Sequence, residues 1–192
     1  MMHRLLPPVS PLGWRPVPPP SLPVSHKAWL LRPGALTAGL RSLGKMDLRV
    51  LAEYASGAPA DEAHGMWLAP GTPVWVREIA MAIDGRDAVV ARSLTPLPAS
   101  HGVWQNMRRL RTRPLADMLY HDRTIRRSPF ACARLAHPLA LYRTVLGVDA
   151  DCARAPLWAR RSVFWRHGLP LLVAECFVPG FWRDILGSRR PV

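Results

Sequence analysis

One dipeptide, Asp84-Gly85, constrains the fold of this 192-residue chain more than any other feature. Runs of β-branched and apolar residues flank it on both sides, over Val74 to Thr95. Asp-Gly between two such runs is the strongest short-range signal for a β-hairpin, because both residues tolerate the left-handed backbone of a tight turn. The sequence therefore predicts two antiparallel strands that meet at this turn.

A second hairpin is predicted over Leu157 to Pro179, with its turn at His167-Gly168. Helical patterns lie between the hairpins, and the chain shows no repeated strand-helix-strand unit. This arrangement favours an α+β fold built on an antiparallel sheet. The length of the chain points to a single domain with an ordinary hydrophobic core.

The helices are predicted from apolar residues at helical spacing. In the first quarter of the chain this spacing indicates two short helices, separated by a break at Pro33-Gly34, that lead into a strand near Asp47 to Leu51. The same spacing predicts a helix over Trp104 to Tyr120, broken at its proline. Leu135 to Pro156 is predicted to be a helical or irregular connection between strands.

The two ends of the chain differ from its middle. Residues 1–25 are rich in proline and are predicted to form a disordered tail, while 26–185 form the folded domain and 186–192 a flexible C-terminus. No run of eighteen apolar residues occurs, so no membrane insertion is expected and a cytoplasmic location is predicted.

The charge and the cysteines of the chain argue against several classes of function. The net charge of +13 raises the question of nucleic acid, but no RNA- or DNA-binding motif accompanies it, and nucleic acid is not an expected partner. The odd number of cysteines and their spacing predict neither a disulfide framework nor a zinc site. The three are Cys132, Cys152 and Cys176; Cys176, next to Glu175, is predicted to be a buried structural thiol.

The register of the first hairpin suggests a binding site. Counting outward from Asp84-Gly85 places Arg77 opposite Arg92, on the more apolar face of the strand pair. Two opposed arginines repel each other unless something negative lies between them. The arginine fork suits a small mono- or dicarboxylate. The alternatives are a protein carboxylate, such as Glu78 or Glu175, and a solvated face.

The register of the second hairpin brings Glu175 opposite Arg160. An ordinary cross-strand salt bridge is the simpler interpretation of this pair. However, Glu175 is the only acid in an otherwise nearly continuous apolar strand, Leu171 to Val178. A carboxylate in such a strand is either paired or available for acid–base chemistry with a raised pKa.

Several short motifs occur in a fixed order between Ala28 and Pro179. They are Trp75-Val76-Arg77-Glu78-Ile79, Asp84-Gly85, Ala91-Arg92-Ser93, Arg113-Pro114-Leu115, Leu157-Trp158-Ala159-Arg160-Arg161-Ser162 and Leu169-Pro170-Leu171-Leu172-Val173-Ala174-Glu175. In this order and spacing the chain resembles the chorismate pyruvate-lyases of ubiquinone biosynthesis. That resemblance implies a lyase of the oxo-acid class that splits chorismate into 4-hydroxybenzoate and pyruvate without a cofactor or metal, and a monomer is expected.

The resemblance also implies roles for individual residues. Arg77 would bind the carboxylate that stays on the product ring, Leu115 would contribute its backbone, and Glu175 would contact the ring hydroxyl and act as a catalytic group. Leu36 occupies a ligand-contacting position where the family has methionine. Arg92 is assigned, from the hairpin register, to the enolpyruvyl carboxylate or the leaving oxygen.

Two other functions remain possible from the sequence. The same type of fold serves as a ligand-sensing module in some bacterial transcription regulators, so a non-catalytic domain that binds small aromatic carboxylates is the first alternative. A basic nucleic-acid binder is the second, and it predicts binding that weakens steeply with salt.

Overall fold

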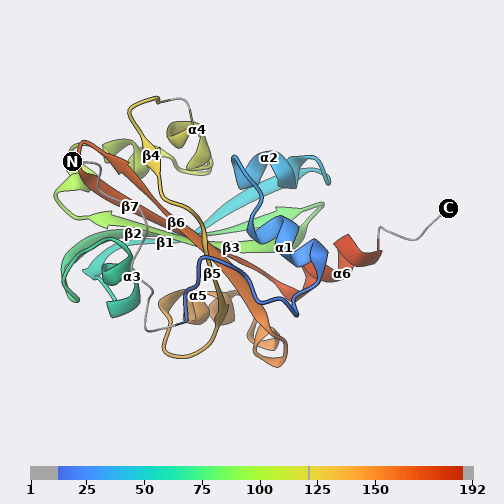
Figure 1. Cartoon of the computed structure of the whole chain (residues 1–192). Coiled ribbons are helices and arrows are strands. Elements are labelled where there is room, and N and C mark those ends of the chain that lie inside the picture. Colours follow the sequence, from blue (N-terminus) through green and yellow to red (C-terminus); the bar gives the residue numbers. More distant parts are fainter. Residues whose placement is uncertain (1–12, 121, 188–192) are drawn as a thin grey trace.

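The computed structural model of the chain describes residues 13–120 and 122–187, and its centre is one antiparallel sheet with helices on both faces (Figure 1). The sheet has seven strands, in the order β1-β2-β3-β7-β6-β4, and β5 also pairs with β6. The predicted α+β fold is confirmed. The strands are β1 (Met46–Gly57), β2 (Pro73–Ile83), β3 (Arg86–Pro96), β4 (Arg126–Arg127), β5 (Ala131–Leu135), β6 (Leu157–Arg166) and β7 (Leu169–Phe177).

Both predicted hairpin turns are present. Asp84 and Gly85 connect β2 to β3 with φ angles of 48° and 78°, and His167 and Gly168 connect β6 to β7 with 49° and 75°. Positive φ at both central residues is the backbone of a type I′ turn, whose twist matches that of the flanking strands. As expected, Ile83 pairs with Arg86 next to the first turn.

The predicted register of the first hairpin is wrong beyond its first few pairs. Met81 pairs with Val89 but Ala82 pairs with Asp87, so Ala88 is an extra residue, a β-bulge. The side-chain period of a strand is two, so one inserted residue moves every later side chain of β3 to the other face. Arg77 consequently pairs with Ser93, and Arg92 pairs with Glu78.

Helical segments cover the two faces of the sheet separately (Figure 1). One face carries α2 (Leu36–Arg41) and a covering segment, residues 99–120, which contains η1 (Ala99–His101), η2 (Gln105–Arg109) and α4 (Ala116–Leu119). The opposite face carries α3 (Ala60–Gly65) and α5 (Ala140–Val148), followed by η3 (Ala150–Arg154). At one end of the sheet, α1 (Val24–Leu30) contacts α6 (Pro179–Gly187).

The predicted helices are confirmed in part. The break at Pro33-Gly34 separates α1 from α2, and the connection after Leu135 contains α5 and η3. The strand near Asp47 is longer than expected, since β1 runs to Gly57. The expected helix over 104–120 is reduced to η2 and α4. Among the described residues, no helix combines the length and the apolar character that crossing a membrane requires.

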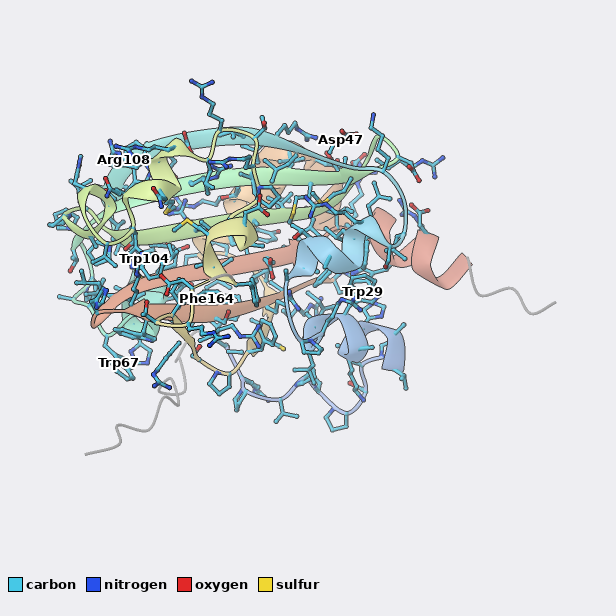
Figure 2. All side chains as sticks on the ribbon, turned by 90° about the horizontal axis from the view of Figure 1, so that it is seen from above. Trp29, Asp47, Trp67, Trp104, Arg108 and Phe164 are labelled. Atoms are coloured by element: carbon cyan, nitrogen blue, oxygen red, sulfur yellow. The ribbon has the colours of Figure 1, made fainter. Side chains whose placement is uncertain are left out.

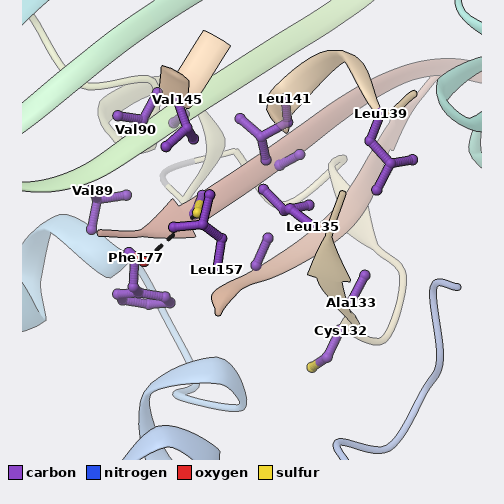
Figure 3. Packing of buried hydrophobic residues seen from close by; sticks show 14 of the residues in the cluster. Val89, Val90, Cys132, Ala133, Leu135, Leu139, Leu141, Val145, Leu157 and Phe177 are labelled. Atoms are coloured by element: carbon purple, nitrogen blue, oxygen red, sulfur yellow. Dashed lines mark hydrogen bonds between the residues drawn. The ribbon is translucent and has the colours of Figure 1, made fainter. Parts of the chain in front are cut away.

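Two hydrophobic clusters hold these layers together. In the main cluster, Val145 of α5 lies close to Val90 of β3 (Figure 3). A second cluster joins the covering segment to β6 and β7 and centres on Trp104, which is fully buried and donates a hydrogen bond of 3.2 Å to the Leu169 carbonyl (Figure 2). The covering segment is therefore packed onto the sheet by its own apolar core.

The expectation of a disordered tail is wrong for residues 13–25. Arg15 exchanges two backbone hydrogen bonds with Cys132, of 2.8 and 2.7 Å. Trp14 is buried at 3% exposure, with its ring 4.4 Å from the guanidinium carbon of Arg161. Burial of the large Trp14 ring fixes this stretch against the domain, although its proline content favoured disorder. Residues 1–12 and 188–192 lie outside the described part of the chain, and α6 reaches two residues into the expected flexible C-terminus.

Replacing Trp14 with alanine should destabilise the domain by about 3–5 kcal/mol, because it removes a large buried aromatic side chain and leaves a cavity. The matched control is Val17→Ala, since Val17 lies three residues away and is 69% exposed. Urea unfolding followed by tryptophan fluorescence measures both variants. Equal midpoints for the two would show that residues 13–25 do not contribute to the folded core.

Candidate active site

A narrow cavity of about 50 Å³ lies between one face of the sheet and the elements α2 and α4. Strands β2, β3, β7 and β6 form its floor, with Ile79, Ala91, Val173 and Ser162 among the residues they contribute. The lining residues are Leu36, Thr37, Ile79, Met81, Ala91, Ser93, Pro114, Leu115, Ala116, Leu119, Tyr120, Phe130, Arg160, Ser162, Phe164, Val173 and Glu175. A mostly apolar wall with a few polar groups is typical of a site for a small organic ligand.

Glu175 and Arg160 form an ion pair in the wall of this cavity. They face each other across β7 and β6, as predicted, and Arg160 Nε donates to Glu175 Oε2 at 2.7 Å. The side chain of Arg160 is 2% exposed and that of Glu175 is 16% exposed. The predicted cross-strand salt bridge is therefore confirmed, and the paired carboxylate also lines the cavity.

Arg160 is fixed in place by more than this ion pair. Its Nη1 donates to the carbonyl oxygen of Trp29, near the end of α1, at 3.2 Å, and to that of Arg32, in the stretch that joins α1 to α2, at 3.0 Å. Its guanidinium carbon lies 4.4 Å from the ring centroid of Phe130. Arg160 therefore connects β6 to the chain that precedes Leu36.

Arg77 lies on the same face of the sheet, beside the cavity. It shares this face with Ile79 and Met81 of its own strand, as predicted, and its cross-strand partner Ser93 lines the cavity. Its Nη2 donates to the Arg111 and Arg113 carbonyls at 2.6 and 3.3 Å.

Burial lowers the pKa of Arg77 from its ordinary value, while the neighbouring carboxylate of Glu53, at 3.3 Å, opposes that shift. The two carbonyl contacts position the chain just before Pro114 and Leu115, both of which line the cavity. Arg77 therefore supports one end of the site as well as supplying a buried positive charge there.

Arg92 is not part of this cavity, and its predicted place beside Arg77 is wrong. The β-bulge turns it to the opposite face of the sheet, where its Nε donates to Glu62 Oε1 at 2.7 Å and its Nη1 contacts Glu78 and the Tyr54 hydroxyl. Burial disfavours its charged form, but Glu62 outweighs that effect, so the pKa of Arg92 lies above its ordinary value. Protein carboxylates neutralise this arginine, which was one of the alternatives left open by the sequence.

Tyr120 connects two walls of the site. It follows α4, and its hydroxyl donates to the Gly34 carbonyl, just before α2, at 2.9 Å. Burial raises the pKa of its hydroxyl. Arg160 was predicted only as a partner of Glu175, and the strand period could have placed Ser162 on the same face. Nothing in the local pattern indicated Tyr120 or Phe130.

The three cysteines are free and buried, and the burial of Cys176 was predicted. Burial is the main cause that raises the pKa of Cys132 and Cys152, in each case to about 11, and it also raises the pKa of Cys176. Thiols with raised pKa values are poor nucleophiles at neutral pH. The raised pKa values therefore argue against a nucleophilic role for these three thiols.

The sheet, its two helical layers and the buried cavity define an α+β ligand-binding domain with a carboxylate and a cation in its wall. Similarity to known proteins shows which family within this class the chain belongs to. The model of the family described as "Chorismate lyase" matches residues 13–185, so the match begins inside the expected tail. The chain belongs to this family, and the family match and the relatives identify it as an enzyme of the lyase class.

Individual relatives agree with this assignment. The chain is 63% identical to a probable chorismate pyruvate-lyase of Bordetella avium, over 92% of this chain and 88% of the relative. Among solved structures it is similar to the PhnF C-terminal domain, with a TM-score of 0.51, 15% identity, and coverage of 73% and 87%. It is also similar to a GntR-family transcriptional regulator from Bacillus cereus, with a TM-score of 0.50, 9% identity, and coverage of 71% and 94%. These two structures show the fold alone.

Proposed function

We propose that this chain converts chorismate to 4-hydroxybenzoate and pyruvate without a cofactor. The observation that carries the proposal is the position of Glu175 and Arg77 on one face of the sheet, with the cavity between β7 and β2. One strand separates them, and Glu175 lies two residues beyond Val173, the residue of β7 in line with Arg77, so their backbones are about 12 Å apart. A benzoate-sized ring with a carboxylate at one end and a hydroxyl at the other suits that separation.

The proposed reaction is an elimination. The C4 hydrogen of chorismate leaves as a proton, the ether bond between C3 and the enolpyruvyl oxygen breaks, and the ring becomes aromatic. The enolpyruvate that departs takes the electron pair of the broken bond, gains a proton and becomes pyruvate. Aromatisation supplies the driving force, so the protein mainly has to position the substrate and stabilise the charge that develops.

Each site residue has a defined part in this scheme. Arg77 binds the ring carboxylate, and Leu115 offers its backbone next to the chain that Arg77 positions. Glu175 accepts a hydrogen bond from the C4 hydroxyl and takes the C4 proton. Leu36 contributes an apolar contact from α2.

The test is an assay of the purified chain with chorismate. Formation of 4-hydroxybenzoate is followed by its absorbance, and pyruvate is measured with a coupled dehydrogenase. Equimolar release of both products establishes the reaction. Tight binding of 4-hydroxybenzoate without turnover would instead favour a sensor domain.

We further propose that the enzyme is a cytoplasmic monomer that supplies the first committed step of ubiquinone biosynthesis. In cells that lack the chain, ubiquinone should fall and should return when 4-hydroxybenzoate is added to the medium. Light scattering of the purified protein measures its mass in solution, and a mass near 21.4 kDa is expected.

A further inference from the structure

Chorismate carries two carboxylates, and the structure places only one of the two expected arginines at the site. Arg92 lies on the opposite face of the sheet and is neutralised by Glu62 and Glu78. Arg77 remains for the ring carboxylate. The negative charge of the enolpyruvyl group therefore needs a different partner in the cavity, since an unpaired buried carboxylate is strongly unfavourable.

We infer that Arg160 binds the enolpyruvyl carboxylate of the substrate; this inference rests on the proposed function. Of the described residues that line the cavity, Arg160 alone carries a permanent positive charge. It is almost completely buried, so a bound anion would meet little competition from water.

The hydrogen bonds of Arg160 leave one edge of its guanidinium available. Nε is used by Glu175, and Nη1 is used by the carbonyls of Trp29 and Arg32. Nη2 donates to no residue within 13–120 and 122–187. Arginine has five N–H donors, and those on Nη2 suit a carboxylate oxygen.

The order of the strands agrees with the layout of the substrate. Across the sheet the sequence of side chains is Arg77 on β2, Glu175 on β7 and Arg160 on β6, with β3 between the first two. In chorismate, the ring carboxylate lies opposite C4, and the enolpyruvyl ether is on C3, next to the C4 hydroxyl. Glu175 at the hydroxyl therefore brings its ion-pair partner Arg160 beside the leaving group.

Arg160 would act on the leaving group as well as on binding. When the C3–O bond breaks, negative charge develops on the enolpyruvyl oxygen, close to the carboxylate that the arginine holds. A fixed cation beside developing charge stabilises the transition state more than the ground state. Arg160 is thus expected to affect both kcat and KM.

The experiment compares two aromatic ligands that cannot undergo elimination. One is 3-(1-carboxyvinyloxy)benzoate, which carries both carboxylates; the other is 3-(1-methylvinyloxy)benzoate, in which a methyl group replaces the second carboxylate. Neither has a hydroxyl for Glu175. Calorimetry on the wild-type chain should show that the dicarboxylate binds about 10- to 100-fold more tightly, as expected for a charge-assisted contact.

Variants assign this preference to one residue. Arg160→Gln should abolish the preference and lower kcat/KM for chorismate, and Arg160→Lys should keep part of it, because lysine retains the charge without the planar fork. The control is Arg134→Gln, an equal change of charge at an exposed position on β5. It should leave the preference unchanged.

Three outcomes would overturn the inference: equal binding of both ligands by the wild-type chain, a preference that survives in Arg160→Gln, or a loss of similar size in Arg134→Gln. If Arg160→Gln fails to fold, the two ligands are compared on the wild-type chain and on Arg160→Lys. A preference that is as large in Arg160→Lys as in the wild-type chain would then contradict a role for the planar guanidinium. Absence of chorismate turnover in a wild-type chain that prefers the dicarboxylate would contradict the proposed function and leave the carboxylate site intact.

Discussion

Replacing Glu175 with glutamine is expected to lower kcat for chorismate by about 10²- to 10⁴-fold, the usual contribution of a positioned acid–base group. Glutamine keeps the shape of the side chain and an oxygen that can accept the hydrogen bond from Arg160 Nε. It cannot accept the C4 proton. Steady-state assays that follow both products measure the effect on kcat and KM separately.

The same substitution has a structural consequence that must be measured beside activity. Arg160 is buried, and removing its carboxylate partner Glu175 can destabilise the fold by about 3–5 kcal/mol. Thermal unfolding separates this effect from a loss of chemistry. Asp47→Asn is the control, since Asp47 is exposed on β1. A well-folded Glu175→Gln variant with wild-type kcat would refute the assignment of Glu175 as the proton acceptor.

Replacing Arg77 with alanine is expected to lower kcat/KM by about 10²- to 10³-fold, because it removes one member of a buried, charge-assisted contact. The loss should have two sources. The ring carboxylate loses its cation, and the carbonyls of Arg111 and Arg113 lose the donor that positions the chain before Leu115.

Arg77→Lys separates these two sources. Lysine keeps the positive charge but cannot serve several acceptors with one planar group, so KM should rise while part of kcat is retained. Arg109→Ala is the control, because Arg109 is an exposed arginine of η2 in the same covering segment. If Arg77→Ala matched the control in kcat/KM, the ring carboxylate would have to bind elsewhere.

The two hairpins show what a sequence can and cannot predict about a sheet. In the second hairpin, the register counted from His167-Gly168 is uninterrupted, and Glu175 pairs with Arg160 as predicted. In the first hairpin, the turn is correct but Ala88 adds one residue to β3. A bulge has no distinctive residue in this stretch, because alanine is compatible with either arrangement. The count therefore placed Arg92 on the wrong face.

The remaining site residues also fall into those that the sequence predicted and those that it did not. The strand period and the family resemblance together predicted Arg77, Leu115, Leu36 and Glu175, which the structure places in or beside one cavity. Tyr120 reaches the site through tertiary packing of α4 against the loop at Gly34, which no local pattern specifies. The tail was misjudged for the same reason, since Trp14 is held by distant residues.

The separation of the two hydrophobic clusters has a consequence for changing the substrate range of this enzyme. Residues such as Leu115 and Leu119 belong to the cluster under the covering segment, and they also line the cavity. The main cluster, with Leu40, Val90 and Leu157, joins different parts of the fold. Libraries that vary the covering segment can therefore reshape the roof of the cavity while the scaffold beneath keeps its packing, which makes this segment a natural starting point for directed evolution.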